Sequence, residues 1–324
     1  MIINDKIYGK QEIIDPIILE LIATSEMQRL KHINQYGVWD LFDPKYFTSR
    51  FDHSVGAYLL LRKFNAPREE QIAGLLHDIS HTAFSHVIDY VFDDSEFQSV
   101  HERFHQQVIF DSQIPAIIKK YSLDINHIID EHNFPLLENN LPDICADRLD
   151  YFLRDSSLIG ITTPQEIQII QSALIVHHNE FVFNHPDAAY LASTKFIQTC
   201  QQFWGSPLQS GSYTLMSNIL KRALDKKIIT ERDFFSTDKS LLKKLKDCQD
   251  KDITNQFDLF SYDRIIESTK EDYTFHTKSK ARYIDPKILI NGQLKHTTEL
   301  FPQLQQQIDT LKEKFKQGYY IKIV

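Results

Sequence analysis

The sequence predicts a mainly α-helical fold with small β-hairpins and a smaller α+β appendage at the C-terminal end. Apolar residues recur at helical spacing over most of the first two thirds of the chain. The 324 residues include only 9 glycines and 11 prolines, which leaves little room for long linkers. Helical patterns lie at about 53–64, 69–77, 84–92, 95–110, 143–155, 164–174 and 186–228.

The N-terminal segment combines a hairpin signal with a helix start. Residues 2–14 alternate around Asn4-Asp5 and are expected to form a short β-hairpin that turns there. Asp15-Pro16 then places an N-cap acceptor before a proline at the first helical position. The helix expected after it carries an apolar stripe at Ile18, Leu21, Ile22, Leu30 and Ile33.

A change of composition divides the chain. From Glu231 onward lysine becomes dense, and short β-like segments such as RYIDPKILI and YYIKIV appear. We therefore expect one large domain over residues 1–230 and an α+β appendage over residues 231–324.

Composition also restricts the partners. The formal net charge of −8 argues against nucleic acid, because phosphate neutralisation needs a basic face, although a local basic pocket could hold one small anionic substrate. No apolar run approaches the ~20 residues of a membrane span, and the N-terminus lacks a signal-peptide pattern. The 3 cysteines lie far apart and cannot form a disulfide framework. These features predict a reduced, cytoplasmic protein without a membrane partner, and they are compatible with a homo-oligomer.

The strongest local signal is LLHDISHTAFSH, residues 75–86. His77-Asp78 ends an apolar run, His81 and His86 follow, and Asp89 comes three residues after His86. A carboxylate at an apolar helix end needs a partner, because burying an unpaired charge is costly. The alternative is a solvated histidine-rich loop, which the buried apolar neighbours disfavour.

Two further motifs carry metal-capable side chains. In SRFDHSVG, residues 49–56, His53 is expected to begin an amphipathic helix. In ADRLDYFLRD, residues 146–155, a helical projection predicts one polar face, with two other charged residues directed away from it. That face contains Asp147, Tyr151 and Asp155, and the residues directed away are Arg148 and Asp150. Each motif taken alone could equally be an N-cap or a surface salt bridge.

Together the motifs have the order His, His-Asp, Asp, which resembles the HD superfamily of metal-dependent phosphohydrolases. The segments RLKHINQYG, SRFDHSVG, LLHDISHTAFSH, HERF and DRLDYFLRD are more specifically similar to the deoxynucleoside triphosphate triphosphohydrolase branch. That branch includes the mammalian sterile-alpha-motif-and-HD enzyme and the bacterial dGTPases. The similarity covers about residues 25–160, with a weaker match near 205–225. The resemblance implies an HD-domain helical bundle that hydrolyses nucleotides, releasing deoxynucleoside and triphosphate.

The resemblance also implies residue roles. The positions that match the metal ligands are His53, His77, Asp78 and Asp147, and they would hold a divalent ion such as Mn, Fe, Ni, Co, Zn or Mg. The positions that match catalytic residues around the scissile phosphate are His81, His86, Asp89 and His101. The positions that match substrate contacts are Arg50 and Arg148 for phosphate, Gln35, Tyr151 and Asp155 for the sugar, and Tyr213.

The chemistry of these side chains suggests a different role for each in the hydrolysis. Hydrolysis needs a proton for the leaving oxygen, and His86, with Asp89 orienting its other ring nitrogen, is the candidate acid. His81 and Arg50 are expected to stabilise the pentavalent phosphorus by aimed charge. His101 and His105, four apart on a predicted helix, could bind a second metal, but we favour one phosphate-facing and one surface histidine.

A second hairpin is predicted over residues 173–184, turning near His178-Asn179. The neighbouring histidines His177 and His178 fall at that turn. Because turn histidines seldom bind metal without convergent partners, we expect them to be exposed.

The similarity is weakest where triphosphate-cleaving relatives carry a basic stretch. The comparable residues 203–218 contain no Arg, Lys or His, although Lys221 and Arg222 follow closely. Affinity is therefore expected to depend little on the number of phosphates. Two alternatives stay open: a phosphatase or phosphodiesterase on a nucleoside monophosphate or other small phosphorylated metabolite, and a non-catalytic nucleotide-binding sensor. The second is disfavoured because all four ligand positions and the His86–Asp89 pair are present.

Overall fold

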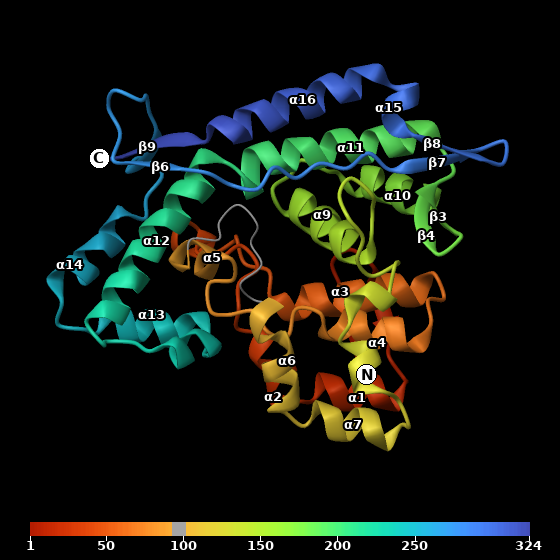
Figure 1. Ribbon diagram of the computed structural model, residues 1–324, viewed down its shortest axis with the longest axis horizontal. Coiled ribbons are helices and arrows are strands. Elements are labelled where there is room, and N and C mark those ends of the chain that lie inside the picture. Colours follow the sequence, from red (N-terminus) through yellow and green to blue (C-terminus); the bar gives the residue numbers. More distant parts are fainter. Residues whose placement is uncertain (93–101) are drawn as a thin grey trace.

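The computed structural model describes residues 1–92 and 102–324, and helices dominate this part of the chain (Figure 1). The helices before residue 230 are α1 (Pro16–Ile22), α2 (Ser25–Leu30), α3 (Arg50–Lys63), α4 (Arg68–Leu76), α5 (Val87–Val91), α6 (Glu102–Phe110), α7 (Ile114–Lys120), α8 (Ile125–Ile128), α9 (Ala146–Leu158), α10 (Pro164–Ala173), α11 (Pro186–Thr199) and α12 (Pro207–Asp225). Those after it are α13 (Asp238–Lys246), α14 (Lys251–Thr254), α15 (Thr297–Leu300) and α16 (Pro302–Gln317). The predicted mainly α class is confirmed. Within the described ranges, no helix is both long and apolar enough for a membrane span.

The strands form small sheets at the edges of the helical body. The strands are β1 (Ile2–Asp5), β2 (Gly9–Glu12), β3 (Leu174–His177), β4 (Glu180–Phe183), β5 (Ile265–Glu267), β6 (Phe275–Thr277), β7 (Lys287–Ile290), β8 (Gln293–His296) and β9 (Tyr319–Ile323). β1 and β2 form a hairpin, and β5, β9 and β6 form an antiparallel sheet. A four-stranded sheet in the order β3-β4-β7-β8 joins a hairpin from each part of the chain, because β4 pairs in parallel with β7.

The N-terminal predictions are partly corrected. The first hairpin turns at residues 6–8, not at Asn4-Asp5, because the Asp5 side chain accepts hydrogen bonds from two amides of that turn. Asp15 caps α1 as predicted. The single helix expected to reach Ile33 is two short helices, since the Thr24 hydroxyl caps a new helix start. The second hairpin turns at His178-Asn179, where both residues have positive φ, and its prediction is confirmed.

Helix α3 is the centre of the bundle. The sequence predicts an amphipathic helix, but nearly every side chain from Arg50 to Leu61 is buried, because α3 packs between α4 and α9. The approach of α9 depends on Gly56, where a Cβ atom would lie 2.0 Å from the Asp150 carboxylate. This close contact lets side chains of α3 and α9 meet.

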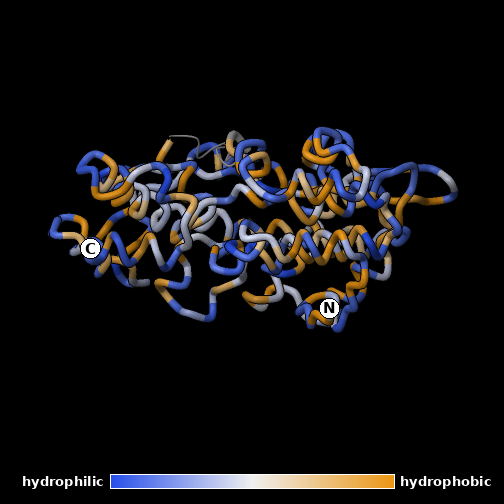
Figure 2. The backbone as a smooth tube through the Cα atoms, turned by 90° about the horizontal axis from the view of Figure 1, so that it is seen from below, coloured by the Kyte–Doolittle hydropathy of each residue, from blue (hydrophilic) through white to orange (hydrophobic). Residues whose placement is uncertain are grey.

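The C-terminal region packs against the rest of the chain. Helix α16 runs along α11, and the two termini lie far apart on the elongated molecule (Figures 1 and 2). The main hydrophobic core contains residues from both sides of residue 230, including Ile265, Ile288 and Ile321. In Figure 2, apolar and polar stretches alternate along the helices, as expected when each helix buries one face. The boundary between residues 1–230 and 231–324 stays a prediction.

Candidate active site

Three elements bring the predicted metal ligands together. His53 lies in the first turns of α3, Asp147 in the first turn of α9, and His77 at the C-cap of α4, with Asp78 directly after it. The Ser49 hydroxyl caps α3 by accepting from the backbone of that first turn, which fixes the start of the helix. All four side chains therefore sit at helix ends that face one point.

The ligand atoms converge closely enough for one ion. His53 Nε2 lies 2.9 Å from Asp147 Oδ1 and 3.2 Å from His77 Nε2, and His77 Nε2 lies 3.3 Å from Asp147 Oδ1. The Asp78 carboxylate is 3.6 Å from each imidazole nitrogen. Ligands at about 2.1 Å from a first-row ion are roughly 3.0–3.4 Å apart, so the spacing and the donor set fit a divalent metal.

The second nitrogen of each imidazole is held in place. His53 Nδ1 is 2.7 Å from Asp150 Oδ2, and His77 Nδ1 is 2.8 Å from the Gly74 carbonyl oxygen. Asp150 is fully buried and accepts two hydrogen bonds from Arg154. These partners turn both Nε2 atoms toward the centre. The prediction that Asp150 points away from the polar face of this helix is wrong. Asp150 comes three residues after Asp147, and residues at that spacing lie on the same face of a helix.

The electrostatics of the cluster favour a cation. Burial alone would lower the pKa of His53, but hydrogen bonds to Asp147 and Asp150 outweigh it and raise the pKa to about 9. Burial also opposes protonation of His77, yet the charges of Asp78 and Asp147 raise its pKa to about 10. The carboxylates therefore hold either protons on the imidazoles or a metal that displaces them.

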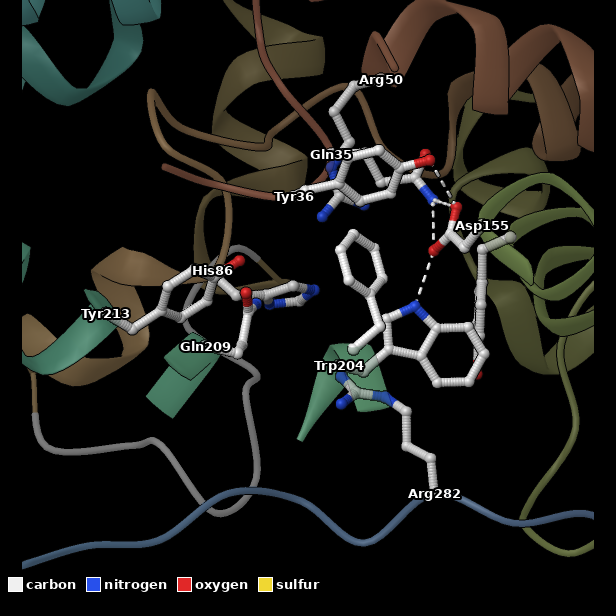
Figure 3. Close-up of a pocket in the computed structure, with 11 residues that line it drawn as sticks. Gln35, Tyr36, Arg50, His86, Asp155, Trp204, Gln209, Tyr213 and Arg282 are labelled. Atoms are coloured by element: carbon white, nitrogen blue, oxygen red, sulfur yellow. Dashed lines mark hydrogen bonds between the residues drawn. The ribbon is translucent and has the colours of Figure 1, made fainter. Parts of the chain in front are cut away.

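The loop after the metal ligands presents the candidate acid. Phe84 and Ser85 have φ values of 62° and 49°, a backbone conformation that non-glycine residues adopt only when the surroundings enforce it. The Asp238 side chain accepts from the Phe84 amide at 2.7 Å and so holds this turn. His86 Nδ1 then meets the buried Asp89 Oδ2 at 2.8 Å, which leaves Nε2 directed into a pocket (Figure 3).

His81 lies beside the metal ligand Asp78. Its Nε2 lies 3.0 Å from Asp78 Oδ1, and its ring meets the ring of His86 edge-on at 5.0 Å. Burial, helped by the charge of Arg50, lowers the pKa of His81 to about 3. The stabilisation of the phosphate by His81 stays a prediction.

A narrow pocket adjoins the metal ligands. It is lined by Gln35, Tyr36, Arg50, His86, Tyr151, Asp155, Phe203, Trp204, Gln209, Tyr213 and Arg282 (Figure 3). Arg50 connects the two regions, because its guanidinium donates to Asp78 Oδ2 at 2.8 Å and to Ser85 Oγ at 3.0 Å. The free space within the pocket is about 70 Å³. Ligand pockets usually measure about 300–1,000 Å³, so a nucleotide would require the walls to move.

One wall of the pocket is organised around Asp155. Its carboxylate accepts from Trp204 Nε1 at 2.7 Å, from the Tyr36 hydroxyl at 2.9 Å and from Gln35 Nε2 at 3.2 Å. Burial raises the pKa of Asp155 to about 7, against the effect of these donors. Among the described residues, the buried Gln35 Oε1 finds no hydrogen-bond donor, so this wall offers an acceptor to a ligand.

The structure also places the other predicted substrate residues. Tyr213 enters the pocket beside Gly37, where a Cβ atom would lie 2.6 Å from the tyrosine hydroxyl. Arg148 does not line the pocket. Its guanidinium donates to the loop before α9, at 3.1 Å to Glu138 and 2.7 Å to the Asp143 carbonyl. Its predicted phosphate contact therefore stays a prediction.

The structure describes one histidine of the pair considered for a second metal. His101 lies outside the described residues, and the half-buried His105 has its Nε2 3.3 Å from the Leu76 carbonyl oxygen. His105 is thus not the surface histidine expected from the sequence. A further group of donors, formed by Glu138, Cys145 and Asp147, already contacts the Arg148 guanidinium, which disfavours a second cation there.

Several pocket residues were not predicted. No sequence motif assigned a role to five of the lining residues, which are Tyr36, Phe203, Trp204, Gln209 and Arg282. Trp204 ends a single π-helical turn, Cys200–Trp204, and such turns often occur at functional sites but have no sequence signature. Tyr36 could have been found, because it follows the predicted Gln35 directly.

Comparisons with known proteins agree with this geometry. The HD domain family model matches residues 50–155. The chain is 36% identical over 327 residues to the uncharacterised protein YdhJ of Bacillus subtilis, covering 100% of this chain and 99% of YdhJ. It is 33% identical over 226 residues to the metal-dependent phosphohydrolase cns2 of Cordyceps militaris, covering 68% of this chain and 65% of cns2.

Two more distant similarities complete the comparison. The SAMHD1 homologue of Dictyostelium discoideum, a deoxynucleoside triphosphate triphosphohydrolase, is 30% identical over 199 residues, covering 52% of this chain and 38% of the homologue. A crystal structure of a phosphohydrolase from Bacteroides thetaiotaomicron superposes with a TM-score of 0.69 at 18% identity, covering 100% and 99% of the two chains, and so shares the fold. The chain belongs to the HD-domain family and is a metal-dependent phosphohydrolase.

Proposed function

We propose that this enzyme hydrolyses the ester bond between a deoxynucleoside and its phosphate chain, releasing deoxynucleoside and triphosphate from a deoxynucleoside triphosphate. One observation carries the proposal. The candidate acid His86 and the acceptor group of Gln35 line the same pocket, and Arg50 connects that pocket to the metal ligand Asp78. A phosphate at the metal centre would thus have its leaving oxygen on the side of His86 and its sugar on the side of Gln35.

The reaction follows from these positions. His53, His77, Asp78 and Asp147 would hold a divalent cation, which would supply Lewis acidity for the hydrolysis. Water adds to phosphorus, the bond between phosphorus and the nucleoside oxygen breaks, and His86 Nε2 gives its proton to that oxygen. Asp89 holds the imidazole in one orientation during the transfer, and Arg50 is placed to stabilise charge on the phosphate.

Support for a nucleoside comes from the other side chains that line the pocket. The pocket combines aromatic faces from Tyr36, Trp204 and Tyr213 with the hydrogen-bonding groups of Gln35 and Asp155. Flat apolar walls with a few polar groups suit a base and a sugar hydroxyl. The Dictyostelium relative, which carries the triphosphohydrolase name, makes the triphosphate the first substrate to test.

A second candidate has a specific observation in its favour. The pocket is narrow, and two cations that the sequence offers for phosphate binding are used elsewhere. Arg222, just after residues 203–218, pairs with Asp250 and Asp252, and Arg148, in α9, pairs with Glu138. A phosphatase acting on a nucleoside monophosphate cleaves the same bond but needs fewer charge-assisted contacts. The two candidates differ only in how many phosphates leave.

Product analysis decides between them. The purified enzyme is supplied in turn with Mn²⁺, Fe²⁺, Ni²⁺, Co²⁺, Zn²⁺ or Mg²⁺ and incubated with deoxynucleoside mono- and triphosphates. Release of deoxynucleoside with triphosphate is the expected result. Release of inorganic phosphate from a monophosphate alone would select the phosphatase. If no metal supports hydrolysis of any nucleotide, while a non-nucleotide phosphate ester is cleaved, the nucleotide assignment is wrong.

A further inference from the structure

A short segment of the C-terminal region connects two loops beside the pocket. The acid loop, residues 79–86, ends at the candidate acid, and the glutamine loop, residues 31–36, contains Gln35. Residues 234–238, which end at the first residue of α13, bond to both loops through the backbone. These hydrogen bonds measure 2.8 Å to the acid loop and 3.2 Å to the glutamine loop. The segment therefore lies between the two loops.

The Asp238 carboxylate completes this connection. Its Oδ1 accepts from the Phe84 amide at 2.7 Å, and its Oδ2 accepts from the Asn34 amide at 2.6 Å. The side chain is buried, so water competes little for either oxygen. Hydrogen bonds to an ionised carboxylate are also stronger than those between neutral groups. One carboxylate thus binds one amide of each loop and fixes the distance between them.

The glutamine loop is fixed from another direction. The Gln35 amide donates to the Thr48 carbonyl at 2.8 Å. The Arg50 amide donates to the Ile33 carbonyl at 3.0 Å. Both bonds attach the loop to the start of α3, a helix that also carries a metal ligand. The position of the glutamine loop is therefore set by the metal centre's own helix, without the C-terminal region.

The acid loop depends more on such support. Phe84 and Ser85, the two residues before His86, both have positive φ, an unfavourable backbone conformation for residues other than glycine. The Ser85 hydroxyl donates to the Asn34 carbonyl at 2.6 Å, which adds a second bond to the glutamine loop. Surrounding hydrogen bonds therefore hold the turn that leads to His86, and Asp238 supplies one of the charged ones.

We propose that Asp238 is a positioning residue for the candidate acid: its carboxylate fastens the acid loop to the glutamine loop and so sets where His86 Nε2 lies in the pocket. This inference rests on the proposed function through the acid role of His86. A proton donor must lie within about 3 Å of the leaving oxygen, so a small shift of the turn weakens the transfer. Asp238 is not among the described residues that line the pocket, and it acts through His86.

The experiment uses the full chain loaded with Mn²⁺ and two isosteric substitutions. Asp238→Asn replaces one accepting oxygen with an N–H donor, so one of the two amides loses its acceptor. Asp285→Asn is the matched control. Asp285 is also a buried carboxylate of the C-terminal region, but it accepts from the amide and the hydroxyl of Thr298, at 2.9 and 2.7 Å. Measurements at pH 8 keep Asp238 ionised, since burial raises its pKa to about 7.

Hydrogen exchange tests the connection itself. Peptides that contain the acid loop or the glutamine loop are followed by mass spectrometry, with metal content and melting temperature recorded for each protein. We expect Asp238→Asn to speed exchange about tenfold or more in at least one of the two loops, because an amide without its charged acceptor opens more readily. Asp285→Asn should leave both loops unchanged. Equal exchange in the native enzyme and Asp238→Asn, in both loops, would overturn the inference.

Steady-state kinetics with deoxyadenosine triphosphate tests the route through His86. We expect Asp238→Asn to lower kcat about tenfold or more in the native enzyme, but less than about threefold when His86→Ala is already present, because the acid can be lost only once. KM should change less than about threefold, since the glutamine loop keeps its bonds to α3. Asp285→Asn should match the native enzyme.

Two kinetic results would contradict the positioning role. Equal kcat losses with and without His86 would show a general structural effect, and a raised KM with unchanged kcat would place the effect on substrate binding. If no nucleotide is hydrolysed, the proposed function alone is overturned. Hydrogen exchange then decides whether Asp238 positions the acid loop.

Discussion

The metal centre and the pocket beside it are built in different ways. The four metal-facing side chains come from three short stretches of the HD domain, and their ligand atoms lie 2.9–3.6 Å apart. The pocket is lined from widely separated segments, including the loop of Gln35, the π-helical turn of Trp204 and the C-terminal segment of Arg282. In the metal centre the ligand atoms are nearly in contact. In the pocket the lining residues surround an open space, and only the folded chain brings them together.

The two regions are therefore expected to have different tasks: the metal centre carries out the hydrolysis, and the pocket selects the substrate. A metal centre needs few donors at fixed distances, so helix ends with locked imidazoles suffice. A substrate pocket needs shape and charge on several sides, and here part of it comes from the region after residue 230. Asp238 of that region holds the turn before His86, and Arg282 faces the pocket. Substitutions in the metal centre should therefore affect every substrate, and those in the pocket should affect substrates unequally.

The largest effect is expected from removing two metal ligands. His77→Ala combined with Asp78→Ala should reduce bound metal from about one ion per chain to a trace and abolish hydrolysis of all substrates. Elemental analysis of protein purified without chelator measures this directly. The double control His177→Ala with His178→Ala alters histidines at a hairpin turn and should keep the metal. Full metal retention in the first variant would refute the ligand assignment.

Loss of the candidate acid should leave the metal in place. His86→Ala is expected to reduce kcat by about 10²-fold or more, because the leaving oxygen no longer receives a positioned proton. Metal content and kcat are measured on the same preparation. If the variant instead loses metal, and excess ion restores turnover, His86 belongs to the metal centre and the boundary drawn between the two regions is misplaced.

Asp150 offers a test of how the metal centre is oriented. Asp150→Asn should weaken metal affinity by about 10–100-fold, because His53 Nδ1 loses its charged partner while no ligand is removed. Competition with a chelator of known affinity measures the change. Asp52→Asn changes an exposed carboxylate of α3 that accepts from the Ser49 hydroxyl; it is the control and should leave the metal affinity unchanged. A lower melting temperature with unchanged metal affinity would mean that Asp150 serves only the buried pair with Arg154.

The smallest effect is expected on the pH dependence of folding stability, through the buried Asp155 in the wall of the pocket. Burial raises the pKa of Asp155 to about 7 and, in the C-terminal region, that of Asp238 to about 7. The folded state therefore keeps protons that the unfolded chain has lost, so these groups make stability fall as pH rises from about 4 to 7. Asp155→Asn should remove the part of the slope due to Asp155 and leave the parts due to Asp238 and Glu131, because burial also raises the pKa of Glu131 to about 7. Urea unfolding of the metal-free protein between pH 5 and 7.5 measures the slopes. Equal slopes in both proteins would show that Asp155 is ionised in the native state.

Much of the metal centre could be predicted from short stretches of sequence. His77 and Asp78 are adjacent, and Asp147 and Tyr151 share a helical face by spacing, so local patterns marked them as candidates. Their assignment as metal ligands and substrate contacts came from the order of the three motifs and its resemblance to the HD superfamily. The same helical spacing could have placed Asp150 near the metal ligands, since a residue three positions from Asp147 lies on the same face. The break after α1 was harder, because Thr24 can occupy a helix interior or an N-cap, and only its hydrogen bond distinguishes them.

The sequence by itself determined the helical class, the N-cap at Asp15 and the set of ligand-type side chains, because these depend on the period of the backbone and on neighbours a few residues apart. The tertiary structure decided which side chains share a pocket. Trp204 reaches Asp155 only because a π-helical turn redirects the chain, and Arg282 reaches the pocket only because its segment is anchored to Cys200. Such contacts join residues far apart in the chain, and no local pattern records which of them pack together.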